Sequence, residues 1–473
     1  MKSVALHNLG CKVNAYEFDV MQQMLQEKGY QIVSFDERAD IYIVNTCSVT
    51  NMADRKSRQM LHKAKKMNPE AIVIATGCYV QTGEDDLEED VAVDLIIGNN
   101  KKKDLTDIIE EFLEQKQGAF LNKTAKPDKT LGDTTVIDIN KTDEYEEMQL
   151  THTAEHTRAY IKIQDGCNQF CTYCIIPYAR GRVRSRKPED ILREVAGLVK
   201  TGYREVVLTG IHLSSYGVDF VNNPTEGQSD YMLAGGVGFD KKTLAFEREF
   251  LLKLIEDINK TEGIERIRLG SLEPRIITPR FVEKLSALEK LCPHFHLSLQ
   301  SGCNETLKRM NRHYTAEEYL EKVEILRKYF PDAAITTDVI VGFPGETKEE
   351  FEITKAYLTK IEFYEMHIFK FSKRQGTPAA EMKNQVPDME KNLRSDELLT
   401  MELAQSEKYR RRFLDKEVTA LMEEEKIIDE LTYQIGHTKE YVKVAKQTEE
   451  PLSNWLVTGV VTGFLQNDIL LMQ

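Results

Sequence analysis

The sequence lacks the features that mark membrane and secreted proteins. No apolar run approaches the roughly 18 residues of a membrane span. The first residues do not show the basic, apolar and small-residue pattern of a secretory signal. Low-complexity tracts and long-period repeats are absent, and tryptophan occurs once. We therefore expect a cytoplasmic protein without a membrane partner.

The chain also lacks an excess of positive charge. Its 63 Lys and Arg residues are outnumbered by 77 Asp and Glu residues, which gives a formal net charge of −14. This balance argues against a non-specific nucleic-acid binder but leaves room for local basic surfaces. Three basic clusters stand out: Arg55, Lys56, Arg58, Lys63, Lys65 and Lys66; Arg180, Arg182, Arg184, Arg186 and Lys187; and Lys408, Arg410, Arg411 and Arg412.

A length of 473 residues suggests about three domains. In residues 1–135, apolar strand patterns alternate with helical patterns, which predicts an α/β domain with a doubly wound parallel sheet. The same alternation over residues 136–400 predicts a partial (β/α)6 barrel. A stretch rich in Asn, Pro and Gly interrupts it at 219–247 and indicates a surface excursion. Short β-rich pieces in residues 401–473 predict a small antiparallel β-barrel.

The strongest chemical signal is a group of three cysteines, Cys167, Cys171 and Cys174, after the candidate strand AYIKIQ. In a cytosolic chain, cysteines at fixed spacing favour metal or redox chemistry over disulfides. A structural zinc site needs four ligands, and no fourth cysteine is near. Three thiolates fit a [4Fe-4S] cluster with one iron open to a small molecule. The remaining alternative is three core cysteines in a loop.

A second group, Cys11, Cys47 and Cys78, is dispersed along the first domain, each after a candidate strand. The carboxyl ends of parallel strands share one edge of the sheet, so these thiols are expected to converge. The alternative is that each is a small buried core residue. Cys292 and Cys303 have no such partners and are interpreted as structural.

At this point the motifs resemble a known family. GCNQFCTYC is similar to the radical S-adenosylmethionine (SAM) signature, and GCKVN, NTC and TGC resemble the N-terminal domain of the methylthiotransferases. LTGIHLSSYG, RIRLGSLEP, HLSLQSGCNETLKRMNRHY, TTDVIVGFPGET and HIFKFSKRQGTPA resemble further motifs of that family. The β-rich tail resembles a TRAM domain, a small RNA-binding barrel. The resemblance covers nearly the whole chain, although the 219–247 excursion departs from the family's short loop.

Within the family, GCKVN and FCTYCIIPYARGRVRSR resemble the subgroup that modifies N6-threonylcarbamoyladenosine in tRNA, next to the anticodon on its 3′ side. Two other subgroups act on isopentenyladenosine in tRNA and on an aspartate of a ribosomal protein, and both remain alternatives. A more distant alternative is a non-enzymatic RNA-binding protein with structural zinc.

The resemblance implies two [4Fe-4S] clusters and two SAM molecules per turnover. Cys167, Cys171 and Cys174 would hold the cluster that cleaves SAM to a radical, which removes the hydrogen from C2 of the adenine. Cys11, Cys47 and Cys78 would hold the cluster that delivers sulfur, and the second SAM would methylate that sulfur. The implied partners are the tRNA anticodon stem-loop and an electron donor such as a flavodoxin or ferredoxin.

The resemblance also implies contacts to SAM and RNA. The ordinary alternatives are turns for the glycines, core packing for the aromatics, strand ends for Ser298 and Gln300, and an ion pair with Arg275 or Arg268 for Glu273. The predicted SAM-contacting residues are Tyr173, Gly210, Glu273, Ser298, Gln300, Gly342 and Phe369. The two clusters must face one cavity, expected between the first domain and the carboxyl-end face of the barrel. The predicted RNA-contacting residues, at the mouth of that cavity, are Arg180, Arg182, Arg184 and Arg186.

Overall fold

The computed structural model describes residues 2–122, 128–131, 135–151, 157–220 and 241–473. Most of the predicted 219–247 excursion lies outside the described residues. Its last part differs from the prediction, because helix α9 (Lys241–Asn259) already begins there. None of the described helices is both long enough and apolar enough to cross a membrane.

The N-terminal domain is the predicted doubly wound unit. Its parallel sheet has the order β2-β1-β3-β4-β5. Alternate residues of β1 pack on opposite faces: Val4 and Leu6 lie in one apolar cluster with α1 and α5, and Ala5 lies in another with α2. The elements are β1 (Ser3–Asn8), α1 (Lys12–Glu27), β2 (Gln31–Val33), β3 (Ile41–Thr46), α2 (Asn51–Met67), β4 (Ile72–Gly77), α3 (Cys78–Thr82), α4 (Glu84–Glu89), β5 (Leu95–Ile97) and α5 (Leu105–Asn122).

The second domain is the predicted partial barrel. Strands β6, β8 and β9 are parallel, as are β10, β11 and β12. Single parallel bridges, Ile267 to Leu291 and Leu272 to Leu297, join the two sets. The strands are β6 (Arg158–Asp165), the short antiparallel edge strand β7 (Arg184–Ser185), β8 (Glu205–Gly210), β9 (Arg266–Leu269), β10 (His294–His296), β11 (Ala334–Val341) and β12 (Glu365–Lys370).

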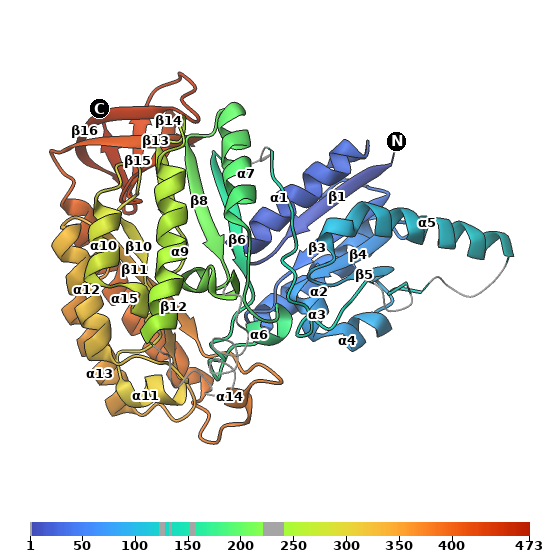
Figure 1. The fold of residues 1–473 in the computed structure, drawn as a ribbon, viewed down its shortest axis with the longest axis horizontal. Coiled ribbons are helices and arrows are strands. Elements are labelled where there is room, and N and C mark those ends of the chain that lie inside the picture. Colours follow the sequence, from blue (N-terminus) through green and yellow to red (C-terminus); the bar gives the residue numbers. More distant parts are fainter. Residues whose placement is uncertain (1, 123–127, 132–134, 152–156, 221–240) are drawn as a thin grey trace.

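Helices connect these strands and cover the outer face of the barrel (Figure 1). Two of them have capping boxes at their first turns, at Thr315 with Glu318 and at Thr347 with Glu350. The helices are α6 (Ile176–Ala179), α7 (Pro188–Lys200), α9, α10 (Pro279–Ser286), α11 (Asn304–Arg309), α12 (Ala316–Tyr329), α13 (Lys348–Ile361), α14 (Pro378–Glu381) and α15 (Asp388–Arg411).

The C-terminal part closes into the predicted small barrel, of order β13-β14-β15-β17-β16. Its pairs are antiparallel except β15 with β17, which run parallel. The predicted division at residues 400 and 401 falls inside α15, so one continuous helix leads from the second domain to the barrel. The strands are β13 (Glu417–Ile428), β14 (Leu431–Thr438), β15 (Lys443–Gln447), β16 (Leu456–Gln466) and β17 (Ile469–Met472).

The small barrel and the cysteines occupy opposite ends of the partial barrel. Buried Arg266 and Arg268, at the start of β9, donate hydrogen bonds to backbone carbonyls of the small barrel, including those of Thr419 and Thr438. The amino ends of the strands are therefore covered (Figure 1). The carboxyl ends, where barrel enzymes place their chemistry, lie at the other end, beside α6, α11 and α14.

Candidate active site

The three dispersed cysteines of the first domain come together. Cys11 precedes α1, Cys47 follows β3 and Cys78 follows β4, so all three stand at carboxyl ends of adjacent parallel strands. Burial raises the pKa of Cys47 to about 12, and the nearby thiols of Cys78 and Cys11 add to the rise. The predicted convergence is confirmed, while the role of these thiols as cluster ligands stays a prediction.

Glycine permits this close approach. Gly77, directly before Cys78, has a φ of 100°, and a Cβ atom there would lie 2.6 Å from the carbonyl oxygen of Thr46. Any other residue would both strain the backbone and push β3 and β4 apart just before Cys47 and Cys78. The TGC sequence therefore positions the third thiol by its glycine.

The second group of cysteines lies in the loop after β6. The backbone N–H of Cys167 donates to the carbonyl of Gly181 (3.0 Å), and that of Cys174 donates to Cys171 (2.9 Å), which folds the loop on itself. Burial, together with the Cys171 thiol, raises the pKa of Cys174 to about 12. Gly166 before this loop has a φ of 72°, and a Cβ there would meet Arg182 O at 1.8 Å.

Both groups have the chemistry that an iron–sulfur cluster needs. All eight cysteines are free thiols. Arg180 Nε lies 3.2 Å from Cys78 Sγ, and Arg312 Nη1 lies 3.3 Å from Cys171 Sγ. A guanidinium donor stabilises the thiolate form, which is the form that binds iron. The residues therefore fit two clusters, each held by three thiolates.

A buried ionic network joins the two groups across the domain boundary. Arg180 is fully buried, and its Nη1 lies 2.7 Å from Glu17 Oε1 of α1 and 3.1 Å from Asp165 Oδ2 of β6. Lys162 Nζ contacts the same two carboxylates at 2.7 and 2.8 Å. Burial by itself would raise the pKa of Asp165, but Lys162 and Arg180 outweigh it and hold that pKa below its usual value.

The prediction that Arg180, Arg184 and Arg186 contact RNA is wrong, because all three side chains are buried. Arg184 donates to the carbonyl of Arg180, and Arg186 pairs with Glu147 and Glu194. A charge run usually forms a solvated face, but here a backbone carbonyl, the buried Glu194 and the exposed Glu147 receive it. Of the predicted four, Arg182 alone is partly exposed, with its guanidinium 4.5 Å from the ring centre of Phe170.

The residues predicted to contact SAM lie at or near the carboxyl ends of strands β8 to β12, except Tyr173, which lies in the cysteine loop after β6. Tyr173 packs edge-on against Phe343 in an apolar cluster with Met310 and Phe371. Phe369 on β12 is 44% exposed. Gly210 lies against Gln164, since a Cβ at Gly210 would lie 2.9 Å from Gln164 Oε1.

The other four residues predicted to contact SAM have contacts or backbone roles within the protein itself. Glu273 pairs with Arg275 (Nε to Oε1, 2.7 Å), which is one of the ion pairs considered as its alternative. Gly342 has a φ of 70°, and Gln300 has one of 74°. The Ser298 carbonyl accepts from the Tyr314 hydroxyl at 2.8 Å. Their contacts to SAM stay a prediction.

Sequence reasoning missed two features of the site. Arg312 touches Cys171 although 141 residues separate them, and only its presence in the motif RMNRHY could have indicated it. His296, Asp338 and His367, on adjacent strands β10 to β12, bring their nitrogen and oxygen atoms within 4.8 Å of one another. Both nitrogens of His296 already face protein partners, Thr336 Oγ1 at 3.0 Å and Asp338 Oδ2 at 3.1 Å.

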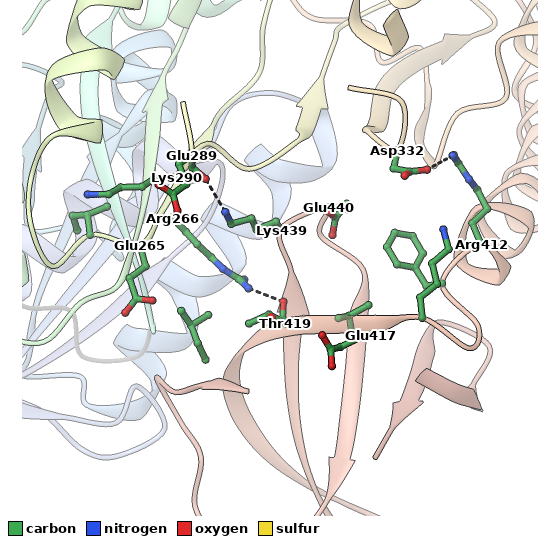
Figure 2. Close-up of a pocket in the computed structure, with 15 residues that line it drawn as sticks. Glu265, Arg266, Glu289, Lys290, Asp332, Arg412, Glu417, Thr419, Lys439 and Glu440 are labelled. Atoms are coloured by element: carbon green, nitrogen blue, oxygen red, sulfur yellow. Dashed lines mark hydrogen bonds and ion pairs between the residues drawn. The ribbon is translucent and has the colours of Figure 1, made fainter. Parts of the chain in front are cut away.

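Two cavities flank the partial barrel. One, of about 630 Å³, lies between its amino end and the small barrel (Figure 2). Two of its cations are already engaged: Lys439 donates to the carbonyl of Glu289, and Arg412 pairs with Asp332. The other cavity, of about 450 Å³, is lined by residues around the first cysteine, including Gly10, Cys11, Lys12 and Tyr160. The second cavity, unlike the first, adjoins the cysteines.

Known proteins share these features. Residues 161–358 match the Radical SAM superfamily, and residues 3–98 match a family described as "Uncharacterized protein family UPF0004". A threonylcarbamoyladenosine tRNA methylthiotransferase, MtaB, of Bacillus subtilis is 38% identical over 95% of this chain and 92% of its own length. This chain belongs to the methylthiotransferase family. As a methylthiotransferase it uses SAM and [4Fe-4S] clusters.

Other relatives of this methylthiotransferase bear two different names. MtaB of Aquifex aeolicus is 38% identical over 89% of this chain and 93% of its own. A tRNA-2-methylthio-N(6)-dimethylallyladenosine synthase of Carboxydothermus hydrogenoformans is 35% identical over 85% of this chain and 83% of its own length. Among solved structures, the radical SAM methyltransferase TsrM of Kitasatospora setae has a TM-score of 0.53 at 15% identity, covering 80% of this chain and 77% of its own. That likeness concerns the fold alone.

Arg180→Met is expected to destabilise the protein by about 3 kcal/mol, because it leaves Glu17 and Asp165 buried with fewer cations. It is also expected to reduce the iron retained on purification, since Cys78 loses its guanidinium donor. Thermal unfolding and iron analysis measure the two effects. Lys187→Met is the matched control, because Lys187 is exposed in the same segment. Equal behaviour of the two variants would contradict the role of Arg180.

Proposed function

We propose that this methylthiotransferase converts N6-threonylcarbamoyladenosine, adjacent 3′ to the tRNA anticodon, to its 2-methylthio derivative. The observation that carries the proposal is the adjacency of the two cysteine groups. α3, which begins at Cys78, packs against α6, which follows Cys174. The 38% identity to MtaB relatives over most of the chain favours this substrate over the dimethylallyl alternative.

The chemistry explains why two groups are needed. The C2–H bond of adenine is unactivated, so acid–base groups alone have no means of replacing it. When bound, the cofactors supply the radical that removes this hydrogen, the sulfur that replaces it and the methyl group on that sulfur. The protein's own part is to bring both sites to one place and to shield them from water.

Particular side chains carry out that part. Arg312 and Arg180 donate to one cysteine sulfur of each group, and the buried network around Glu17 holds the two domains in register. Tyr173, next to Cys174 in the chain, belongs to an apolar cluster with Phe343 and Met310. Apolar side chains at this place would limit the access of water to a reactive radical.

In place of the buried arginines, we assign the RNA-binding surface to helix α2. Its first turn borders the carboxyl end of the partial barrel, because Asp54 pairs with Arg374 at 2.6 Å and the N–H of Asn51 donates to Ser372. Arg55 and Lys56 are exposed on this helix and form no ion pair with any described residue. They would contact the anticodon stem-loop, and a flavodoxin or ferredoxin would supply the electrons.

Deleting the gene is expected to remove 2-methylthio-N6-threonylcarbamoyladenosine from tRNA and to accumulate its unthiolated parent. Nucleoside mass spectrometry of tRNA from cells with and without the gene measures both species. Restoring the gene on a plasmid should return the product. Loss of the dimethylallyl product instead would overturn the proposed substrate but not the reaction, and loss of neither would overturn both.

Cys47→Ala is expected to distinguish the functions of the two cysteine groups. Iron per chain should fall from about eight to about four atoms, as one cubane is lost. Reductive cleavage of SAM to 5′-deoxyadenosine should persist, while methylthio product disappears. Cys292→Ala is the control, because Cys292 is buried away from both groups and should leave iron content and product unchanged. Loss of SAM cleavage in Cys47→Ala would contradict the assignment.

Arg55→Ala combined with Lys56→Ala is expected to weaken binding of a tRNA anticodon stem-loop about tenfold. The slope of log Kd against log salt should fall by about 1.5, because two phosphate contacts are lost and each contributes about 0.7–0.9. Fluorescence anisotropy at several salt concentrations measures both. Lys408→Ala with Arg411→Ala removes the same charge from ion pairs with Glu362 and Glu407 and should leave binding unchanged. Equal losses in both variants would contradict a specific surface on α2.

A further inference from the structure

Lys12 stands beside the first cysteine, in a part of the site where the described residues offer it no partner. It follows Cys11 directly, and both residues line the cavity of about 450 Å³ together with Gly10 and Tyr160. The Lys12 side chain is exposed, and no described residue forms a hydrogen bond or ion pair with its ammonium group. The cavity next to the candidate cluster site, which Asp19 also lines, therefore offers the Lys12 ammonium group to an entering anion.

None of the charged groups around Lys12 neutralises its ammonium group. Arg158 and Arg268 repel it, and each already has its own carboxylate, Glu423 at 3.3 Å and Glu205 at 2.8 Å. Asp338 and the neighbouring Cys11 thiol attract it, but Asp338 Oδ2 faces His296 Nε2 at 3.1 Å. Among the described residues, Lys12 is thus the member of this group of cations left without a carboxylate.

The position is also a poor one for helix stability. Lys12 is the first residue of α1, and the first turn of that helix contains no acidic residue. A cation at a helix N-terminus opposes the helix dipole and disfavours the helix. Lys12 therefore does not serve the helix, and its charge calls for an anion that enters the cavity.

The proposed substrate has such an anion. On adenine, C2 and the N6 substituent flank the same ring nitrogen, N1. With C2 facing a sulfur held near Cys11, the N6 substituent could therefore reach Lys12, which lines the same cavity as Cys11. The threonylcarbamoyl group has one carboxylate, whereas the dimethylallyl group has none. We propose that Lys12 binds the threonylcarbamoyl carboxylate and so selects this nucleoside; the inference rests on the proposed function.

The test compares holoenzymes with both clusters loaded. Wild type, Lys12→Met and Lys12→Arg are given an anticodon stem-loop RNA that contains N6-threonylcarbamoyladenosine, or the same RNA with its carboxylate as the methyl ester. Kd from fluorescence anisotropy and kcat/KM for methylthiolation are measured for each pair. Lys28→Met, at the opposite end of α1, is the matched control. Iron content is determined for every variant.

Lys12→Met should weaken binding and lower kcat/KM on the acid RNA at least tenfold, as expected for a lost charge-assisted hydrogen bond. On the ester RNA it should equal wild type, and its iron content should be unchanged. Lys12→Arg should retain most of the preference for the acid, and Lys28→Met all of it.

Equal effects of Lys12→Met on acid and ester, or no effect on either, would overturn the inference while the proposed function stands. Loss of iron in Lys12→Met together with equal activity losses would assign Lys12 to the cluster site and overturn it as well. Failure of wild type itself on the acid RNA would overturn the proposed function, and the inference with it.

Discussion

The arrangement of the whole molecule depends on one buried guanidinium. Arg180 is fully enclosed and touches Glu17 of α1, Asp165 of β6 and the sulfur of Cys78. Removing such a charge from water is costly, so it can stay there only while all its partners are in place. The position of the first domain on the partial barrel is therefore tied to the position of a cysteine sulfur.

This constraint explains the polar interior of α1. A helix between two domains normally presents apolar residues on both sides, but Asn14, Glu17 and Gln23 are buried here. Asn14 accepts from Arg180 Nη2 at 2.7 Å and donates to the carbonyl of Thr46, just before Cys47. The same hydrogen bonds thus fix the helix, the cysteine edge of the sheet and the loop after Cys174, so that assembly of the domains and formation of the site are one event.

Much of the fold was predictable because it depends on local patterns. Buried apolar strands alternating with amphipathic helices require parallel sheets, and the β-rich tail requires a separate barrel. The convergence of Cys11, Cys47 and Cys78 also follows from topology, since parallel strands end at one edge. The 241–247 segment was misread because the excursion was extended past its Asn-, Pro- and Gly-rich part into residues KKTLAFE, which contain no helix breaker. The basic run from Arg180 to Arg186 was wrongly predicted to face RNA, because the sequence does not reveal that the chain buries these arginines and pairs them with carboxylates.

The sequence by itself determined the fold class and the two cysteine groups, because periodicity and spacing are properties of the chain. Its motifs also carried the resemblance to the family. Only the tertiary structure decided which charges face solvent and which touch sulfur. Arg180 and Cys78 are 102 residues apart, and Arg312 and Cys171 are 141 apart. Contacts over such separations arise when packed strands and helices bring their ends together, and no local pattern encodes them.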